Sequence, residues 1–236
     1  MQAGYRGRVI PMYKIESHIC VFDDLIPSDI CKTLIEECKK YYDTIFYEGP
    51  TIGGVNKTIK DCWDFDFSVS NVQDAGIETL TFEKCATSIM AAVSTAIDMY
   101  FYNFPELDNQ NGFYNTGFRL QHYLQNVGGY KKHCDGMPWD EEPTNRRVLA
   151  IIVYLNELEN GGGTYFPRQN ATVPAKQGSI ALFPATWTHP HVGQTPISDD
   201  KWIISSFFIC NPNTPANTST EITPIAITPT LISMDE

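Results

Sequence analysis

Basic residues are scarce in this sequence. Its 236 residues include 17 lysines and arginines against 28 aspartates and glutamates, which gives a formal net charge of −11 at neutral pH. Proteins that bind the phosphates of nucleic acids rely on clustered basic side chains. The basic runs here are short pairs such as Lys131-Lys132, which we interpret as solvated surface. We therefore expect no nucleic-acid partner.

Long hydrophobic runs are also missing. No stretch approaches the roughly twenty apolar residues that cross a bilayer, and the N-terminus has no apolar run followed by a cleavage site. The seven cysteines are odd in number and form no Cys-x-x-Cys pair, which favours free thiols in a reducing compartment over disulfides. The sequence thus predicts a soluble, cytoplasmic protein with no membrane partner.

Signatures of nucleotide-binding folds are absent as well. The run Gly161-Gly162-Gly163 lacks the Lys-Ser/Thr pair of a phosphate-binding loop and precedes a β-type segment, so we interpret it as a turn. At this length we expect one large domain over residues 1–210. Residues 211–236, rich in Thr, Pro, Ile and Ser without periodicity, are predicted to be a C-terminal extension.

Two amphipathic stretches in the first half of the chain predict helices. One follows Pro27, with Ser28 as the expected N-cap, and the other is an alanine-rich stripe from about Glu83 to Met99. From Phe118 onward the pattern changes to short β-type runs separated by turn residues: FRLQHYL, VLAIIVYL, TYF, SIALF and WIISSFFI. We predict an α+β, mainly β fold, in which N-terminal helices buttress a double-stranded β-helix of the jelly-roll type.

His133, Asp135 and His191 form the most informative pattern. Side chains at i and i+2 of a strand share one face, so His133 and Asp135 could chelate an ion from a single β-segment, with His191 arriving from a distant strand. Two imidazoles and one carboxylate leave coordination positions open, as a catalytic metal requires, and both ferrous iron and zinc accept this set. His189 competes with His191 because both lie on one face of an extended segment.

The segments around these residues strengthen the pattern. The motif HCDG is followed by RRVLAIIVYLN, NGGGTYFP, QGSIALFP, HVGQTPI and DKWIISSFF. Their order and spacing over about residues 118–209 resemble the prolyl 4-hydroxylase branch of the iron(II) and 2-oxoglutarate-dependent dioxygenases. That branch runs Tyr, His-x-Asp, Tyr-Leu-Asn, Gly-Gly-x-Thr-x-Phe-Pro, His-x-Gly and Lys-Trp. The resemblance is specific because the segments must agree together.

The resemblance implies a catalytic metal centre. It makes His133, Asp135 and His191 the iron ligands, because His191-Val192-Gly193 fits the family's third ligand better than His189 does and leaves His189 a supporting role. Since Asp135 is present, no ligand position is vacated for chloride, which favours hydroxylation over halogenation. The implied cofactors are Fe(II), 2-oxoglutarate and O2, with ascorbate as a further candidate.

The resemblance also implies contacts to the cosubstrate. Lys201 would bind the distal carboxylate of 2-oxoglutarate, a task that suits a compact point charge. Lysine in place of arginine there favours prolyl and lysyl hydroxylase relatives over nucleic-acid demethylases. Tyr123 and Thr164 match positions that often hydrogen-bond the same cosubstrate, although Tyr123 stands one position further from His133 than in many eukaryotic members.

The implied reaction is hydroxylation of a peptidyl proline, with oxidative decarboxylation of 2-oxoglutarate to succinate and CO2. The partner would be a peptide or protein that contains proline. Expected substrate residues are Trp139, in the polar loop after HCDG, together with Tyr130 and Arg147; a surface strand position explains Arg147 equally well. Two alternatives stay open: a hydroxylase of a free amino acid, another protein residue or a small metabolite, and a non-catalytic cupin-like binding module.

Overall fold

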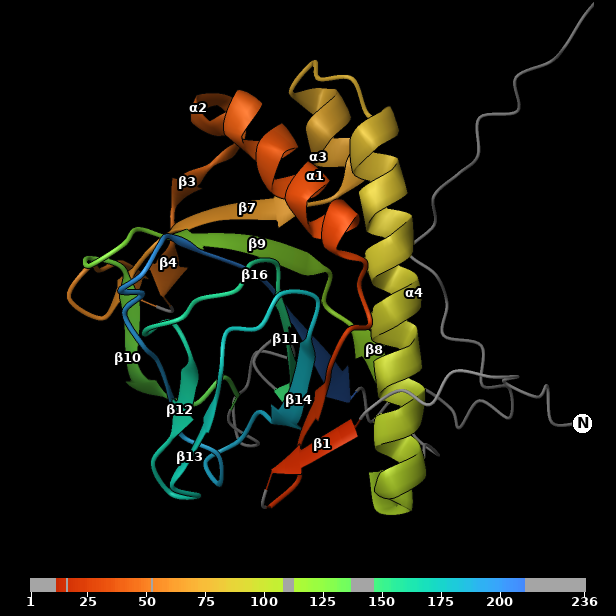
Figure 1. Cartoon of the computed structure of the whole chain (residues 1–236), viewed down its shortest axis with the longest axis vertical. Coiled ribbons are helices and arrows are strands. Elements are labelled where there is room, and N and C mark those ends of the chain that lie inside the picture. The colour runs from red at the N-terminus through yellow and green to blue at the C-terminus, as the bar shows by residue number, and fades with distance from the viewer. Residues whose placement is uncertain (1–11, 16, 52, 108–112, 137–146, 211–236) are drawn as a thin grey trace, which may run out of the picture.

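The computed structural model describes residues 12–15, 17–51, 53–107, 113–136 and 147–210. Four helices in these ranges precede most of the sheet: α1 (Ser28–Lys40), α2 (Tyr42–Ile45), α3 (Val69–Asp74) and α4 (Leu80–Asn103), with a 3-10 turn η1 (Pro105–Leu107) after α4. Figure 1 shows α4 running along one side of the molecule, with α1 packed against it.

The first predicted helix starts differently from the expectation. Ser28 is not the N-cap: it is the first residue of α1, and Pro27 occupies the capping position. The fixed φ of proline suits the residue that leads into a helix, and Ser28 Oγ instead donates a hydrogen bond to Gln177 Oε1 at 2.6 Å. That contact ties the start of α1 to the loop at residues 174–179.

The second predicted helix is longer than expected. α4 begins before Glu83 and ends after Met99. Phe82 and Tyr100 are both completely buried, so they extend the apolar stripe at both ends of the predicted segment. Helical stability in proteins comes mainly from packing of such a face, which explains why tertiary contacts lengthen the element.

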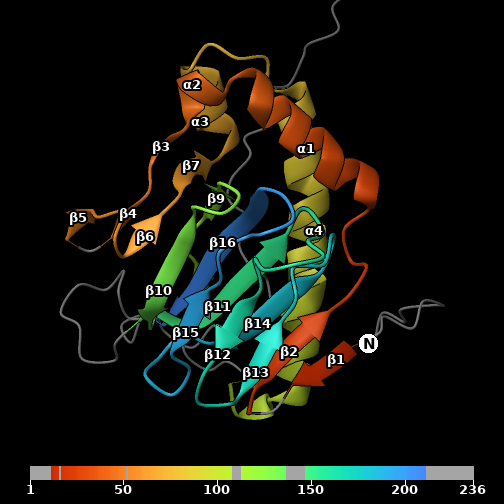
Figure 2. The ribbon, with the colours of Figure 1, turned by 60° about the vertical axis from the view of Figure 1, so that its left-hand side comes forward.

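Two sheets lie face to face (Figure 2). The major sheet has the order β1 (Met12–Ile15), β2 (Ile19–Phe22), β14 (Ile180–Pro184), β11 (Arg147–Tyr154), β16 (Lys201–Cys210), β9 (Phe118–Tyr123), β7 (Trp63–Phe67) and β3 (Tyr47–Glu48), and β8 (Phe113–Asn115) also pairs with β16. The minor sheet has the order β13 (Ala171–Val173), β12 (Thr164–Phe166), β15 (His191–Gly193), β10 (Gly129–His133) and β6 (Lys60–Asp61). A small ribbon pairs β4 (Pro50–Thr51) with β5 (Gly54–Val55).

All the β-type runs predicted after Phe118 are strands, and the double sheet with helices on one face confirms the predicted fold class. The strands before residue 68 were not predicted. Among them, WDFDF in β7 alternates apolar and polar residues strictly, a signal of a half-buried strand. Gly161 and Gly162 both have positive φ, a region that favours glycine, and Gly161 forms an isolated antiparallel bridge with Pro196.

The major sheet separates two hydrophobic cores. Along β16, Trp202, Ile204 and Phe208 pack into the core that contains α1 and α4, whereas Ile203 belongs to the core on the opposite face. Period-2 alternation of the strand produces this division. The opposite face is the one that meets the minor sheet, and it positions the site described below.

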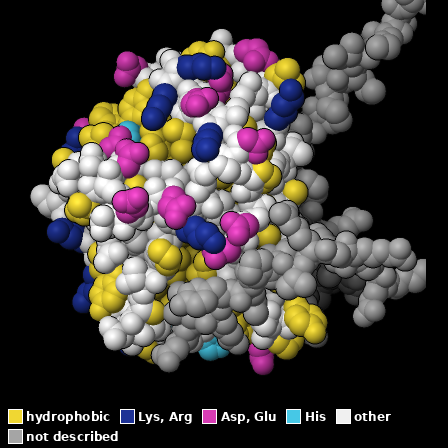
Figure 3. Space-filling view, viewed as in Figure 1, with side chains coloured by type: hydrophobic (Ala, Val, Ile, Leu, Met, Phe, Trp, Pro, Cys, Tyr) yellow, Lys and Arg dark blue, Asp and Glu magenta, His cyan; other side chains and the backbone are white. Residues whose placement is uncertain are grey.

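On the face in Figure 3, acidic and basic side chains are interspersed. Among the described helices, none combines the length and apolar composition needed to cross a bilayer. The proposed extension at 211–236 lies outside the described residues, so the domain division stays a prediction.

Candidate active site

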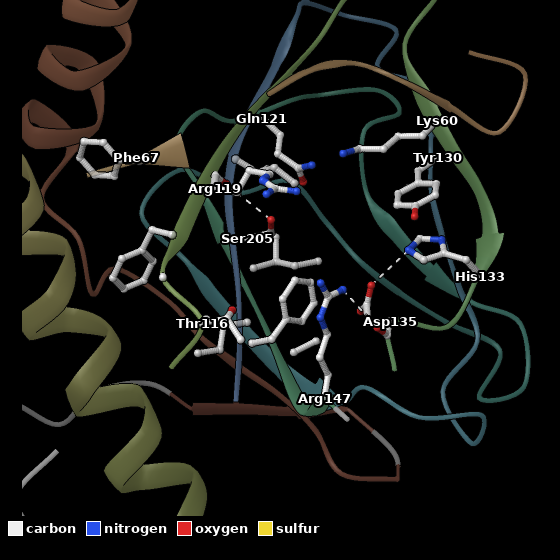
Figure 4. Close-up of a pocket in the computed structure, with 18 of the residues that line it drawn as sticks. Lys60, Phe67, Thr116, Arg119, Gln121, Tyr130, His133, Asp135, Arg147 and Ser205 are labelled. Atoms are coloured by element: carbon white, nitrogen blue, oxygen red, sulfur yellow. Dashed lines mark hydrogen bonds and ion pairs between the residues drawn. The ribbon is translucent and has the colours of Figure 1, made fainter. Parts of the chain in front are cut away.

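A cavity of about 690 Å³ lies between the two sheets. Its walls include Lys201 and Tyr123 from the major sheet and His133 and His191 from the minor sheet. Figure 4 shows side chains from both sheets pointing into this space. The double sheet therefore gathers residues that are far apart in the sequence around one cavity.

His133 and His191 face each other across two paired strands. β10 and β15 are antiparallel, and His133 stands directly opposite His191 in the register. Asp135 was expected on the same strand as His133, but this detail is wrong, because β10 ends at His133. The backbone N–H of Asp135 donates to the Ala185 carbonyl at 3.0 Å. The pairing of β10 with β15 therefore ends before Asp135, whose carboxylate is positioned by the segment that follows the strand.

The three side chains bring their donor atoms together, within 4.8 Å of one another. Asp135 Oδ1 lies 3.3 Å from His133 Nε2, and Asp135 Oδ2 lies 3.4 Å from His191 Nε2. His133 Nδ1 faces the Lys131 carbonyl at 2.8 Å, and His191 Nδ1 faces the His189 carbonyl at 3.1 Å. Because a carbonyl only accepts, each Nδ1 carries the proton and each Nε2 offers its lone pair. This donor set fits a divalent transition metal.

Ionisation in this cluster suits cation binding. Burial lowers the pKa of His191 to about 4, so its imidazole is neutral at pH 7. Burial acts to raise the pKa of Asp135, but His191 and His133 outweigh it, and the pKa of this carboxyl lies below its usual range. A neutral imidazole and an ionised carboxylate are the forms that a metal requires.

His189, the competing ligand candidate, points elsewhere. Its Nε2 contacts the Ser17 carbonyl at 2.5 Å, and its Nδ1 contacts Thr188 Oγ1 at 2.9 Å. Both ring nitrogens are therefore occupied, and the Nε2 contact joins the segment before β15 to the segment before β2. The backbone carbonyl of His189, not its ring, supports His191.

Lys201 is buried at the cavity with 2% exposure. Burial lowers the pKa of its ammonium to about 8. No carboxylate of the described residues forms an ion pair with Lys201, and its Nζ lies 5.3 Å from the ring centre of Tyr123 and 5.8 Å from that of Tyr154. A buried cation without a counter-charge is unfavourable unless an anion joins it.

The other predicted cosubstrate residues lie beside Lys201. Tyr123 is almost completely buried, and its hydroxyl lies 3.4 Å from Gln121 Oε1. Thr164 Oγ1 is hydrogen-bonded to the Tyr154 hydroxyl at 2.7 Å. The structure thus brings Lys201, Tyr123 and Thr164 to the wall of one cavity.

Asn156 holds the backbone on both sides of Lys201. Its Nδ2 donates to the Asp200 carbonyl at 2.7 Å, and its Oδ1 accepts from the Trp202 N–H at 2.9 Å. The Asp200 carboxylate is in turn 2.9 Å from His122 Nε2. These contacts set the start of β16, and hence the direction in which the lysine enters the cavity.

The predicted substrate residues Tyr130 and Arg147 both line the cavity. The Tyr130 ring stacks on His133, with ring centres 3.5 Å apart and planes inclined by 17°. Arg147 Nη1 donates to the Asp135 carbonyl at 3.1 Å. Trp139 lies outside the described residues.

A register shift explains how Arg147 reaches the cavity. The pairing of β11 with β16 slips between Arg147 and Leu149. Simple alternation would place Arg147 on the same face as Leu149, which packs in the core with α1 and α4. A β-bulge changes the direction of a side chain in this way and is common beside active sites.

One part of the cavity wall was not predicted. Lys60 Nζ pairs with Asp64 Oδ2 at 2.6 Å, and both side chains are buried. Asp64 Oδ1 also accepts from Gln121 Nε2 at 3.0 Å, and Arg119 Nε pairs with Asp66 Oδ1 at 2.8 Å. The alternating WDFDF run could have placed Asp64 and Asp66 on the same face of a strand, but nothing in the sequence reveals their partners.

Comparison with known proteins agrees with this geometry. Residues 118–209 match the sequence model of the 2OG-Fe(II) oxygenase superfamily. The chain is 24% identical over 184 residues to a "Putative prolyl 4-hydroxylase" of Acanthamoeba polyphaga mimivirus, a match that covers 75% of this chain and 69% of that protein.

Solved structures share the fold. A Trichoplax adhaerens prolyl hydroxylase, in complex with a peptide of the hypoxia inducible factor oxygen degradation domain, superposes with a TM-score of 0.62 and 16% identity, covering 82% of this chain and 84% of that one. The viral collagen prolyl hydroxylase of Paramecium bursaria Chlorella virus-1, in its 2-oxoglutarate complex, gives a TM-score of 0.59 and 15% identity, covering 83% of this chain and 98% of that one.

Proposed function

We propose that this chain is a dioxygenase that hydroxylates a peptidyl proline, and the match of residues 118–209 to the sequence model of the 2OG-Fe(II) oxygenase superfamily supports this proposal. One observation carries the proposal: the His133, Asp135 and His191 cluster shares a cavity with a buried lysine that has no counter-charge. The cluster has the donors for Fe(II), and the lysine has the charge for a dicarboxylate. Neither feature is explained by packing alone.

The residues of the site fit the cofactors that the superfamily implies. We assign His133, Asp135 and His191 to Fe(II), because both Nε2 lone pairs and the carboxylate converge. We assign Lys201 to the distal carboxylate of 2-oxoglutarate, with the Tyr123 and Thr164 hydroxyls as further donors. When bound, Fe(II), 2-oxoglutarate and O2 supply the oxidation of a substrate C–H bond, coupled to conversion of 2-oxoglutarate to succinate and CO2.

The chain itself contributes orientation and exclusion of water. The hydrogen bonds from His133 and His191 to backbone carbonyls fix both rings, and the Tyr130 ring covers one face of His133. Lys201 would lose its remaining water when it pairs with a carboxylate, so the pair would be strong in this buried corner. Tyr130 and Arg147 border the space next to Asp135, where a substrate carbon would have to lie.

The proline assignment is supported by the relatives. The mimivirus protein is described as a prolyl 4-hydroxylase candidate, and both superposed structures are prolyl hydroxylases. Lysine at position 201 agrees with the pattern of that branch. A peptide or protein that contains proline is therefore the proposed partner.

The iron assignment can be tested by spectroscopy. Anaerobic protein with Fe(II) and 2-oxoglutarate should show the weak visible charge-transfer band of the chelated complex. His133→Ala should abolish the band, and His189→Gln, a change in a buried histidine that points away from the cluster, should keep it. A wild-type protein without the band would contradict the assignment.

The substrate assignment needs a separate test. Proline-containing peptides incubated with the enzyme, Fe(II), 2-oxoglutarate and O2 should release succinate and gain the mass of one oxygen atom on proline. Turnover of a free amino acid, with none for any proline peptide, would reject the peptidyl substrate and support the free amino-acid alternative.

A further inference from the structure

Two of the basic side chains that line the cavity form ion pairs within the described chain. Lys60 pairs with Asp64, and Arg119 pairs with Asp66. In the proposed function, a carboxylate of 2-oxoglutarate compensates the positive charge of Lys201, and the metal ion compensates the negative charge of Asp135. Arg147 is the lining cation of the described residues that is left without an acidic side chain as partner.

The Arg147 guanidinium is held so that one edge stays free. Its carbon lies 3.8 Å from the centre of the Phe207 ring, which covers one face of the group. Nη1 donates to the Asp135 carbonyl. Nε, on the opposite edge, is buried, and neither Nε nor Nη2 on that same edge has a hydrogen-bond acceptor among the described residues. The stacking on Phe207 and the bond to Asp135 hold this edge in place beside the proposed metal site.

A free guanidinium edge has a specific preference. Nε and Nη2 together present two parallel N–H donors, which match the two oxygens of a carboxylate. A single carbonyl oxygen would satisfy one donor and leave the positive charge uncompensated. Burial lowers the pKa of Arg147 in spite of Asp135, which reflects how poorly the charge is solvated. An unsatisfied buried donor is unfavourable and uncommon in proteins.

We infer, building on the proposed function, that the substrate presents a carboxylate to the Nε and Nη2 edge of Arg147 beside the metal site. Either an acidic side chain close to the target residue or a C-terminal carboxylate has this chemistry. In a chain with a net charge of −11, an anionic substrate would be repelled by most of the surface and held at this point. Selectivity for acidic substrates would therefore reside in Arg147.

The test uses pairs of isosteric ligands. Proline peptides with Asp or Asn, and with Glu or Gln, at each position flanking the proline form one arm, and peptides ending in a free acid or an amide form the other. Binding to the anaerobic protein loaded with Fe(II) and 2-oxoglutarate is measured by calorimetry, followed by kcat/KM in air. The acidic member of at least one pair should bind about tenfold to a hundredfold tighter, and the arm that shows the preference identifies the source of the carboxylate.

Variants locate the preference. Arg147→Gln should remove the difference within each pair, and Arg147→Lys should keep part of it, because lysine retains charge but not the two-donor edge. Arg119→Gln removes an arginine of the same cavity that is already paired, so the acidic-to-neutral ratio should stay at its wild-type value. The 2-oxoglutarate charge-transfer band tests the binding of Fe(II) and 2-oxoglutarate separately, because this band does not depend on Arg147.

Three results would overturn the inference while the band persists. They are equal affinity within every pair, an acidic preference that survives Arg147→Gln, and failure of every carboxylate ligand to bind. Loss of the band itself would instead reject the proposed function.

Discussion

Toward α1 and α4, strand β16 places Trp202, Ile204 and Phe208 in a hydrocarbon core, whereas on its other face Lys201 and Ser205 line the cavity. Both sets come from one strand and alternate along it. The first set lowers the free energy of the folded state by removing apolar surface from water. The second set includes a buried ammonium that opposes folding until an anion arrives. The side chains on one face of β16 therefore stabilise the fold, and those on the other face are available to bind a ligand.

The largest effect is expected from a change in the opposite wall of that cavity, on β15. His191→Ala should lower turnover by more than about a hundredfold, because even supporting residues around a metal contribute ten- to a hundredfold and His191 is itself a proposed ligand. The free energy of unfolding of the metal-free protein should stay close to the wild-type value. Succinate release, together with chemical denaturation, measures the two effects. Normal turnover would break the comparison.

A change on the helix face should act in the opposite way. Ile204→Ala should lower the free energy of unfolding by about 2–5 kcal/mol, because it leaves a void in a completely buried position. Turnover per folded molecule should stay close to wild type, since Ile204 faces away from the cavity. Denaturation midpoints and activity, both measured well below the melting temperature, provide the check. A large loss of activity per folded molecule would show that the two faces are coupled.

Replacing the buried lysine should separate stability from binding at one position. Lys201→Met should stabilise the cofactor-free protein at pH 7 by about 1–3 kcal/mol, because a poorly solvated charge is removed and the volume is kept. The same variant should lose most of its affinity for 2-oxoglutarate. Lys201→Arg is the control, because it keeps the charge. A destabilised Lys201→Met protein would show that the ammonium has a structural partner.

The pH dependence of that stabilisation follows from the pKa of Lys201. The pKa is about 8 in the folded protein and 10.5 ordinarily. Below pH 8 both states are protonated and the full destabilisation is present. Between these two values the unfolded chain binds a proton that the folded protein has released, so wild-type stability rises with pH. The stability gap between Lys201→Met and wild type should therefore close over this range, and a gap that stays constant would contradict the burial of the charge.

The smallest effect is expected one step away from the cavity. Asn156→Ala removes the two hydrogen bonds that hold the backbone on both sides of Lys201. The affinity for 2-oxoglutarate should fall by about fivefold to tenfold, since each neutral hydrogen bond contributes about 1 kcal/mol and part of the loss falls on stability. An Asn160→Ala variant, which changes an exposed asparagine of the same loop, is the matched control. If both variants lowered the affinity for 2-oxoglutarate equally, Asn156 would have no specific role in positioning Lys201.

Much of this architecture could be predicted from local patterns. The strands after Phe118 and the two long helices follow from periodicity, because apolar spacing reports the face that each element buries. Two boundaries differed from the prediction: Ser28 is the first residue of α1, and α4 is about one turn longer at each end, where Phe82 and Tyr100 are buried. The short strands before residue 68 were missed because they are held by pairing with distant partners such as β9 and β10.

The sequence by itself determined the kinds of donor available to the site: two histidines, one aspartate and one lysine, in an order typical of the oxygenase family. Only the tertiary structure decided how they are used. It turned His189 toward Ser17, placed Asp135 beyond the end of β10, and directed Arg147 into the cavity through a register shift. The physical reason is that burial, register and charge compensation depend on segments that meet only after folding, so they leave no local trace in the pattern of residues.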